Sequence, residues 1–455
     1  MARTMDLTEG SILKKMLVFS LPLIAGNLLQ QFYTVADRIV VGRFAADGAT
    51  ALAAVGATAQ PVNLVLGFFL GIATGASVIC SNMLGSGDQS GLRKNMHTAI
   101  LLALLCGMAM SAITIPLVEV FLRWLGTPKS VLGSATRYMQ LYMLGVPASL
   151  VYNVAAGIFR AHGDTKRPMY VLSLSGLVNV GLNLLLVIVF YMDVVGVAIA
   201  TVVSQYLSAG ALLWMMFRPK DQYKLVWKEM KLDKKQVRDI LRIGVPSGLG
   251  GIVFSASNLT IQSAVNQLAA SVPDGAALIA GKTAANDINT FIYQMHGGLA
   301  SSCVSFAGQC NGAKKYKRID KVVFTGIWLS VAFMGIPIAL SCIFAPQAIG
   351  IFNSDPAVMS YGAIFLRILT LSLLLFPLAE CCAAASRGMR HAMMPTVMNL
   401  IAICGIRVCW VLFVFPHFRT IEGLYLSNPI SWLACGALQA VYYIYVRRKL
   451  SKKEA

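Results

Sequence analysis

The sequence contains long hydrophobic segments that recur in the same order in its two halves. Six of these segments lie within residues 12–218 and six more within residues 238–446. Landmark residues recur at one constant spacing, namely Pro168 as Pro395, Arg160 as Arg387 and Gly196 as Gly423. A unit with an even number of crossings returns the chain to its starting side, so two tandem copies have the same orientation. Transporters commonly place the substrate path where such repeats meet.

Each hydrophobic segment is long enough to cross a lipid bilayer, which takes roughly 20 apolar residues in a helix. Apolar residues make up 57% of the chain and charged residues 13%, a composition that a soluble core could not bury. We therefore predict an all-α polytopic membrane protein with twelve transmembrane helices in two six-helix repeats. The predicted spans are 16–41, 50–84, 97–122, 133–159, 168–191, 194–217, 240–270, 277–309, 321–344, 357–386, 393–415 and 422–446.

These spans define two predicted lobes and one polar connection. Residues 1–217 form an N-terminal six-helix lobe, and residues 240–455 form a C-terminal six-helix lobe with a basic tail. The hydrophilic segment 218–239 is too short to be a domain, so we predict that it is a cytoplasmic linker. Its basic residues would lie against anionic lipid headgroups.

The formal net charge of +19 comes mostly from Lys and Arg in alternate connecting segments, on the same side as the N-terminus. This asymmetry follows the positive-inside rule and predicts a multi-pass protein of the plasma (inner) membrane with both termini in the cytoplasm. A nucleic-acid partner is not expected, because the charge is not gathered on a folded soluble face. The expected partners are the lipid bilayer and a small-molecule substrate, and no obligatory protein partner is evident.

The residues that could perform covalent chemistry show no useful arrangement. The ten cysteines form no CxxC pair and the five histidines are scattered, so neither a metal-binding pattern nor a catalytic constellation is present. We predict that the protein is not an enzyme and requires no cofactor.

Polar residues inside the predicted spans are the candidate functional residues, because such residues usually mark an ion or substrate path. Asp37 lies about 33 Å along the first helix from Lys15, towards the outer end. Asn179 and Asn183 share one face of the fifth span because they are four residues apart. Thr201 lies about two turns into the sixth span, which returns from outside. The four side chains are therefore expected at similar depths.

A carboxylate, two amide oxygens and a hydroxyl are hard oxygen donors of the kind that a small alkali cation accepts. Na⁺ could therefore bind at Asp37, Asn179, Asn183 and Thr201. A buried carboxyl group could instead bind H⁺, so the coupling ion is either Na⁺ or H⁺. In the alternative interpretation Asp37 lies at the membrane interface, solvated or paired with Arg38 or Arg43, and the asparagines only join helices.

The second half carries the charges Asp287, Arg367, Glu380 and Arg407. They could neutralise one another, or Asp287 or Glu380 could bind a cationic substrate. His296 could couple to protons or could simply be a hydrogen-bonded packing residue. The candidate residues of a substrate cavity are Gln30, Gln31, Tyr33, Asn258, Gln262, Asp287, His296 and Glu380.

Several motifs resemble those of the multidrug and toxic compound extrusion (MATE) family, and the resemblance covers nearly the whole chain. They are residues 7–10 (LTEG), 30–33 (QQFY), 40–44 (VVGRF), 159–166 (FRAHGDTK) and 198–201 (AIAT), together with Pro22, Asp37, Pro168 and Gly196. The resemblance implies two six-helix lobes arranged as a V around a central cavity. It also implies that Asp37, Asn179, Asn183 and Thr201 form the cation site of the N-terminal lobe.

The function implied by this resemblance is secondary active antiport. The protein would export organic, cationic or amphiphilic drugs or metabolites in exchange for sodium or protons, by alternating access. Some similar sequences have a second carboxylate where this chain has Asn183, which leaves the choice of ion open. The alternative is a flippase or exporter of a lipid-linked or specific endogenous metabolite.

Overall fold

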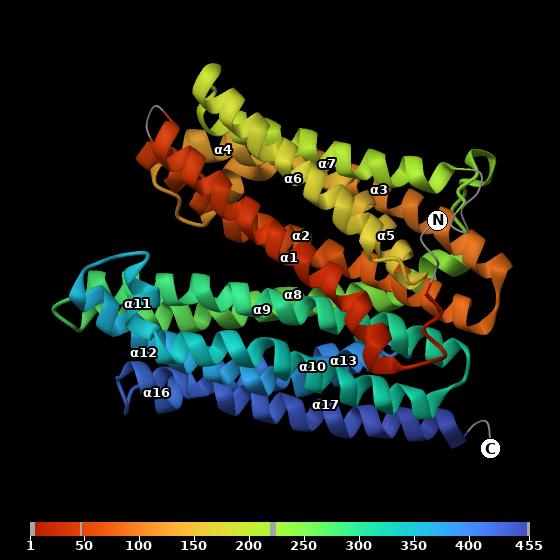
Figure 1. The fold of residues 1–455 in the computed structure, drawn as a ribbon. Helices are drawn as coiled ribbons and strands as arrows, with labels where there is room; N and C mark the ends of the chain where they lie inside the picture. The colour runs from red at the N-terminus through yellow and green to blue at the C-terminus, as the bar shows by residue number, and fades with distance from the viewer. Residues whose placement is uncertain (1–4, 46–47, 219–223, 453–455) are drawn as a thin grey trace. The chain divides into compact units, whose positions relative to one another are not determined.

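The computed structural model describes residues 5–45, 48–218 and 224–452, and all regular structure within these ranges is helical. The long helices of each half lie alongside one another as a bundle (Figure 1). The first half contains α1 Ile12–Phe44, α2 Gly48–Ser86, α3 Gln89–Trp124, α4 Lys129–Leu144, α5 Val146–Ala161, α6 Lys166–Leu184 and α7 Asp193–Phe217. A short π-helical segment, η1 Leu185–Val189, continues α6, and a 3₁₀ turn, η2 Trp227–Glu229, lies in the linker.

The second half repeats this order with more interruptions. Its helices are α8 Lys234–Ala270, α9 Gly275–Gly312, α10 Tyr316–Ile343, α11 Ala345–Gly350, α12 Pro356–Ser372, α13 Phe376–Gly388, α14 Met393–Asn399, α15 Ile406–Cys409, α16 Ile421–Tyr425 and α17 Ser427–Lys452. The 3₁₀ turn η3 Leu373–Leu375 joins α12 to α13, and the π-helical segments η4 Leu400–Gly405 and η5 Trp410–Val414 flank α15.

The helices account for all twelve predicted spans. Within the described residues, ten helices or helix runs are long and apolar enough to cross a membrane, and the pair α4 and α5, bent by 44°, makes eleven. The remaining predicted span, 277–309, is α9, which is 38 residues long but is interrupted by polar residues such as Lys282 and Asp287. The prediction of an all-α polytopic membrane protein is confirmed.

Packing divides the chain into two units. The first contains residues 1–6 and 25–248, and the second contains residues 7–24 and 249–455. The beginning of α1, up to Ile24, therefore packs with the second unit, and the start of α8, up to Gly248, packs with the first. The predicted lobe boundaries, with residues 218–239 as the linker, stay a prediction.

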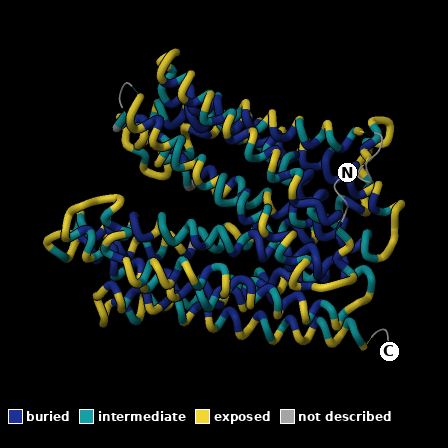
Figure 2. Tube along the Cα trace, in the orientation of Figure 1, coloured by how far each residue is buried: buried dark blue, intermediate teal, exposed yellow. Residues whose placement is uncertain are grey.

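Large apolar side chains are exposed along the outer helices of each unit. On α17, Leu433 and Val441 are 54% and 68% exposed, and Figure 2 shows exposed stretches recurring along this helix. A soluble protein rarely leaves so much apolar surface in contact with water. In a bilayer the lipid chains cover it, as expected for helices that the composition assigns to the membrane.

The connection between α5 and α6 shows why the motif at residues 159–166 has its particular residues. Gly163 has a φ of +83°, a left-handed conformation that glycine adopts without strain. The Asp164 carboxylate accepts hydrogen bonds from the backbone N–H groups of Lys166 and Arg167 and forms an ion pair with Arg167 at 3.2 Å. Burial lowers the pKa of His162 to about 4, so this histidine is neutral near pH 7.

Helices α2 and α8 cross closely within the first unit because glycines line their contact. A Cβ atom at Gly71 would overlap the backbone of Gly244 and Gly248, and one at Gly75 would overlap the backbone at Ile240 and Gly244. Both helices therefore present glycines four residues apart, a spacing that allows backbones in a membrane to approach.

Replacing Gly71 by Val should destabilise the first unit, because the added side chain has no space at the α2–α8 crossing. The expected loss is about 1–3 kcal/mol, which is typical of overpacking, and it can be measured as a lower thermal unfolding temperature in detergent. Gly67→Val is the matched control, because nothing lies within 4 Å of a Cβ at that position of the same helix. Equal unfolding temperatures for the two variants would contradict the described crossing.

Candidate functional site

Three helices of the first unit bring the predicted cation ligands together. Asp37 lies in α1, Asn179 and Asn183 lie in α6, and Thr201 lies in α7. Asn183 Nδ2 donates hydrogen bonds to Asp37 Oδ1 and, at 3.3 Å, to Asn179 Oδ1. Asn179 Nδ2 in turn lies 3.5 Å from Thr201 Oγ1. The four side chains thus form one connected polar cluster.

The contact between α1 and α6 depends on a glycine. The ring of Tyr33, one turn before Asp37, lies where a Cβ atom of Gly176 would otherwise be. The hydroxyl group of Tyr33 donates a hydrogen bond to the carbonyl oxygen of Ser173 at 3.0 Å. These contacts hold α1 against α6, so the Asp37 carboxylate faces the asparagines. The Asp37 carboxylate is thus bonded to a buried residue, Asn183, on a neighbouring helix.

The cluster has an unused electron-pair donor. Asn183 Oδ1 is buried and has no hydrogen-bond partner among the described residues. An unpaired buried amide oxygen is unfavourable, and a cation or a protonated group would compensate it. Together with the Asp37 carboxylate and the Thr201 hydroxyl, it forms a donor set that fits Na⁺ or a bound proton. A π-helical segment begins two residues after Asn183, and such segments are frequent at functional sites.

The cluster opens into a cavity of about 340 Å³ that lies wholly within the first unit. Asp37, Asn179 and Thr201 line this cavity, and so do Gln30 and Tyr33 from the predicted substrate set. Gln31, on the same helix, is half-buried and is not among its lining residues. The structure therefore places two of the three predicted α1 substrate residues beside the predicted cation ligands.

Sequence reasoning missed the aromatic wall of this cavity. Tyr138 and Tyr142 from α4 and Tyr152 from α5 line it, with their rings beside a space that also holds the Asp37 carboxylate. Tyr138 and Tyr142 are four residues apart and their rings lie 6.1 Å from each other. This spacing was the available signal, but among the chain's 15 tyrosines it does not show which ones face a cavity.

The predicted substrate residues of the second half belong to the second unit. Asn258 Oδ1 accepts a hydrogen bond from Arg407 at 3.2 Å. Gln262 accepts a hydrogen bond from Lys282 and donates one to Asn266 at 2.9 Å. Asp287 interacts electrostatically with Lys282. These residues form hydrogen-bonded groups along α8 and α9.

His296 and Glu380 also have partners within the second unit. The ring of His296 lies 3.0 Å from the Ser330 hydroxyl and packs edge-on against Phe376. Glu380 forms an ion pair with Arg387, which lies about two turns further along the same helix, α13. The interpretation in which the four charges of the second half neutralise one another is therefore wrong for Glu380, whose partner is a fifth charged residue.

Arg407 is the most buried of these charges, with 2% of its surface exposed. Its guanidinium group donates to the hydroxyl groups of Ser431 and Ser257, each at 3.3 Å, and to Asn258. It also lies 5.9 Å from the centre of the Trp432 ring. Among the described residues no carboxylate pairs with it, so neutral oxygens and an aromatic face stabilise its charge.

No group of three or more His, Cys, Asp or Glu residues that could hold a metal ion exists in the described ranges. All ten cysteines are free thiols. Because Asn and Thr provide most of the donors around Asp37, that cluster suits a weakly held, exchangeable cation better than a transition metal.

Known proteins resemble this chain over nearly its full length. A probable multidrug resistance protein of Bacillus subtilis (strain 168), YoeA, is 27% identical and the match covers 98% of this chain and 96% of that protein. An FAD transporter of Shewanella oneidensis is 22% identical, with 97% of this chain and 96% of that protein covered. The solved outward-facing structure of a multidrug resistance MATE family transporter of the MOP superfamily has the same fold, with a TM-score of 0.90, 21% identity and coverage of 98% and 99%.

The family comparison agrees with the internal repeat. The MatE family model matches the chain twice, at residues 22–185 and 246–411, once in each six-helix half. The two matches together cover well over half of the sequence. The chain therefore belongs to the MatE family of membrane transporters.

Proposed function

We propose that this protein is a secondary antiporter that exports organic cations or amphiphilic compounds in exchange for sodium ions or protons. The observation that carries the proposal is the Asp37 carboxylate, which is hydrogen-bonded to a buried asparagine and lines an aromatic cavity. YoeA, which bears the name of a probable multidrug resistance protein, supports an export role. We also propose that the protein lies in the plasma membrane with both termini in the cytoplasm, as the charge distribution predicts.

The chemistry of the cavity favours positively charged ligands. Its lining contains one acid, Asp37, and one base, Arg38, which is exposed. The faces of Tyr138, Tyr142 and Tyr152 can attract an organic cation. A small cation or proton bound at Asp37, Asn179, Asn183 and Thr201 would neutralise the carboxylate and weaken the attraction for an organic cation. Competition of this kind at one carboxylate is a simple physical basis for exchange.

Coupling also requires that ion binding change the stability of the transporter's conformations. An ion shifts the equilibrium between outward-open and inward-open forms only if it binds the two forms with different free energies. Helix α1 suits this role, because its residues up to Ile24 pack in the second unit and its remainder, with Asp37, packs in the first. Pro22 lies just before this division and weakens the local helical hydrogen bonding.

A second candidate function is the export of a specific endogenous anion. Arg407 is a buried cation without a carboxylate partner among the described residues, and an anionic substrate group would compensate it. A relative that carries the name FAD transporter is consistent with this alternative. The alternative predicts that transport of anionic substrates, and not of cationic dyes, depends on Arg407.

Replacing Asp37 by Asn should abolish uphill export of cationic dyes while the protein remains inserted and folded, because an amide carries no negative charge and cannot take up and release a proton. Dye accumulation in inside-out vesicles under imposed sodium or proton gradients measures this effect. Glu119→Gln is the control, since that carboxylate is exposed and forms a surface pair with Arg123. Full gradient-driven transport by the Asp37→Asn variant would remove Asp37 from the mechanism.

Replacing Asn183 by Asp should change the ion dependence of transport. Two adjacent carboxylates hold a shared proton to higher pH, so the midpoint of proton-driven transport should move upward by about one pH unit or more. Transport rates measured with sodium and pH varied independently test this prediction. If the variant and the wild type have the same sodium and pH profiles, the assignment of Asn183 to the ion site is wrong.

The ion pair between Glu380 and Arg387 should be structural and not a substrate site. Glu380→Gln or Arg387→Gln alone should lower stability by about 1–3 kcal/mol, because each leaves a partly buried charge unpaired. The exchanged variant Glu380→Arg/Arg387→Glu should recover the wild-type unfolding temperature and transport rate. If the exchanged variant folds but does not transport cationic dyes, Glu380 contacts the substrate and the ion pair is not purely structural.

A further inference from the structure

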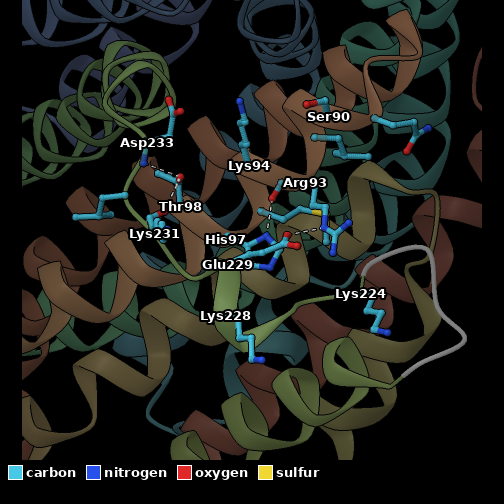
Figure 3. Close-up of a pocket in the computed structure, with 14 residues that line it drawn as sticks. Ser90, Arg93, Lys94, His97, Thr98, Lys224, Lys228, Glu229, Lys231 and Asp233 are labelled. Carbon is cyan, nitrogen blue, oxygen red and sulfur yellow. Dashed lines mark hydrogen bonds and ion pairs between the residues drawn. The ribbon is translucent and has the colours of Figure 1, made fainter.

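A second hollow of the first unit lies away from Asp37, where the linker crosses the beginning of α3. Its volume is about 1000 Å³, and its walls come from the first turns of α3 and from residues 224–233. Figure 3 shows His97 and the Arg93–Glu229 pair near its centre, with Lys94, Lys224 and Lys228 around them. None of the residues that line it belongs to the polar cluster at Asp37.

Specific hydrogen bonds and one ion pair hold the linker against α3 and so define the walls of this hollow. His97 Nε2 accepts a hydrogen bond from the backbone N–H of Val226 at 2.9 Å, and His97 Nδ1 lies 2.7 Å from the carbonyl oxygen of Arg93. The two ring nitrogens thus contact opposite sides of the junction, Nδ1 on α3 and Nε2 on the linker. Thr98 donates to the carbonyl oxygen of Lys231 and accepts from the N–H of Asp233. The Arg93–Glu229 ion pair, at 2.7 Å, also joins α3 to the linker.

The hollow retains an excess of uncompensated positive charge. Five of its lining residues are Lys or Arg and two are Asp or Glu. Within the part of the chain that the structure describes, Lys94, Lys224, Lys228 and Lys231 form no ion pair. Ammonium groups crowded in this way repel one another unless an anion lies between them.

The second unit shows what happens when such a cluster has an internal partner. A basic hollow also lies at the start of α10, the repeat equivalent of α3. There Lys315 pairs with Glu9, and the Arg318 guanidinium donates to the carbonyl oxygens of Leu7, Glu9 and Gly10. Two cations of that hollow, Lys315 and Arg318, thus have partners in the N-terminal segment. The four lysines of the hollow between α3 and the linker form no ion pair within the described residues.

An apolar hollow adjoins the basic one. It has a volume of about 980 Å³ and shares Leu232 with the basic hollow. Val237 and Leu241 add apolar surface, and Lys234, Arg238 and Arg242 add further positive charge. A basic space next to an apolar space with a basic rim suits a ligand with an anionic head and hydrocarbon chains.

Exposed tryptophans place these hollows at the level of the lipid headgroups. Trp227, next to Lys228, is 77% exposed, and Trp214 near the end of α7 is 59% exposed with the Arg218 guanidinium 3.7 Å from its ring centre. Tryptophan is enriched at membrane interfaces, where its ring contacts both lipid and water. Trp124, which ends α3 at the far side, is 82% exposed and marks the opposite interface.

We propose that the hollow between α3 and the linker binds the headgroup of an anionic phospholipid, with its phosphate among Lys94, Lys228 and Lys231 and its chains beside Leu232 and Leu241. Basic clusters of this size next to transmembrane helices attract anionic headgroups. The bound lipid stabilises the docked linker and so the connection between α7 and α8. This site is separate from the Asp37 cavity and does not depend on the proposed transport function.

The test compares lipid retention by the purified full-length protein. After exchange from a mixture of phosphatidylglycerol and phosphatidylethanolamine, native mass spectrometry should show wild-type protein with bound phosphatidylglycerol. The affinity of the variant Lys94→Gln/Lys228→Gln/Lys231→Gln for phosphatidylglycerol should be lower by a factor of about ten. Arg448→Gln/Lys449→Gln/Lys452→Gln, which removes three cations from the end of α17, is the matched control and should retain lipid as the wild type does.

Two further measurements distinguish the remaining outcomes. The first is thermal unfolding of the protein with short-chain phosphatidylglycerol, phosphatidylcholine or inorganic phosphate, and phosphatidylglycerol alone should raise the unfolding temperature. An equal rise with inorganic phosphate would mean that the site binds soluble anions and would overturn the lipid assignment. The variant Lys94→Arg/Lys228→Arg/Lys231→Arg keeps the charge and should keep lipid binding, which separates charge from folding. Equal retention of phosphatidylglycerol by the wild type and the glutamine variant would also overturn the proposal.

Discussion

The hydrocarbon core of a membrane offers no water to a polar side chain, and this constraint organises the whole structure. Every polar group within a span must bind to another part of the protein or to a ligand. Asp37 meets this requirement through Asn183, and Glu380 meets it through Arg387. Asn183 Oδ1 is one of several buried side-chain oxygens without a partner among the described residues, and it belongs to the residue that is bonded to the Asp37 carboxylate.

Each repeat places a polar side chain next to a π-helical segment, but the charged residue involved is an acid in one repeat and a base in the other. In the first unit, the fifth span carries Asn183 just before a π-helical segment, and its partner in the first span is an acid. In the second unit, the corresponding span carries Arg407 between two π-helical segments, and its partners Ser257 and Asn258 are neutral. Duplication therefore preserved the helix distortion at this depth, while the side chains diverged into an acidic and a basic centre.

The fold was largely predictable from the sequence, because hydrophobic length and the repeat of landmark residues depend on the chain alone. The similar depth of Asp37, Asn179, Asn183 and Thr201 was predictable for a related reason, since depth along a helix follows from residue number. Side-chain partners across helices were not predictable in this way. The three tyrosines of the Asp37 cavity depend on helix rotation and on the 44° bend between α4 and α5, which composition does not determine.

The low hydropathy of α9 has a consequence for biosynthesis. Lys282 and Asp287 lie in its first third, and alone among the twelve predicted spans it does not combine the length and apolar character expected of an independent crossing. Charged residues within a span oppose its partitioning from the translocon into lipid. In the folded unit α9 packs against α10, α12 and α13, so these later-synthesised helices must provide its polar residues with protein surroundings. Stable integration of the second repeat should therefore be cooperative and completed only after α13 has emerged from the ribosome.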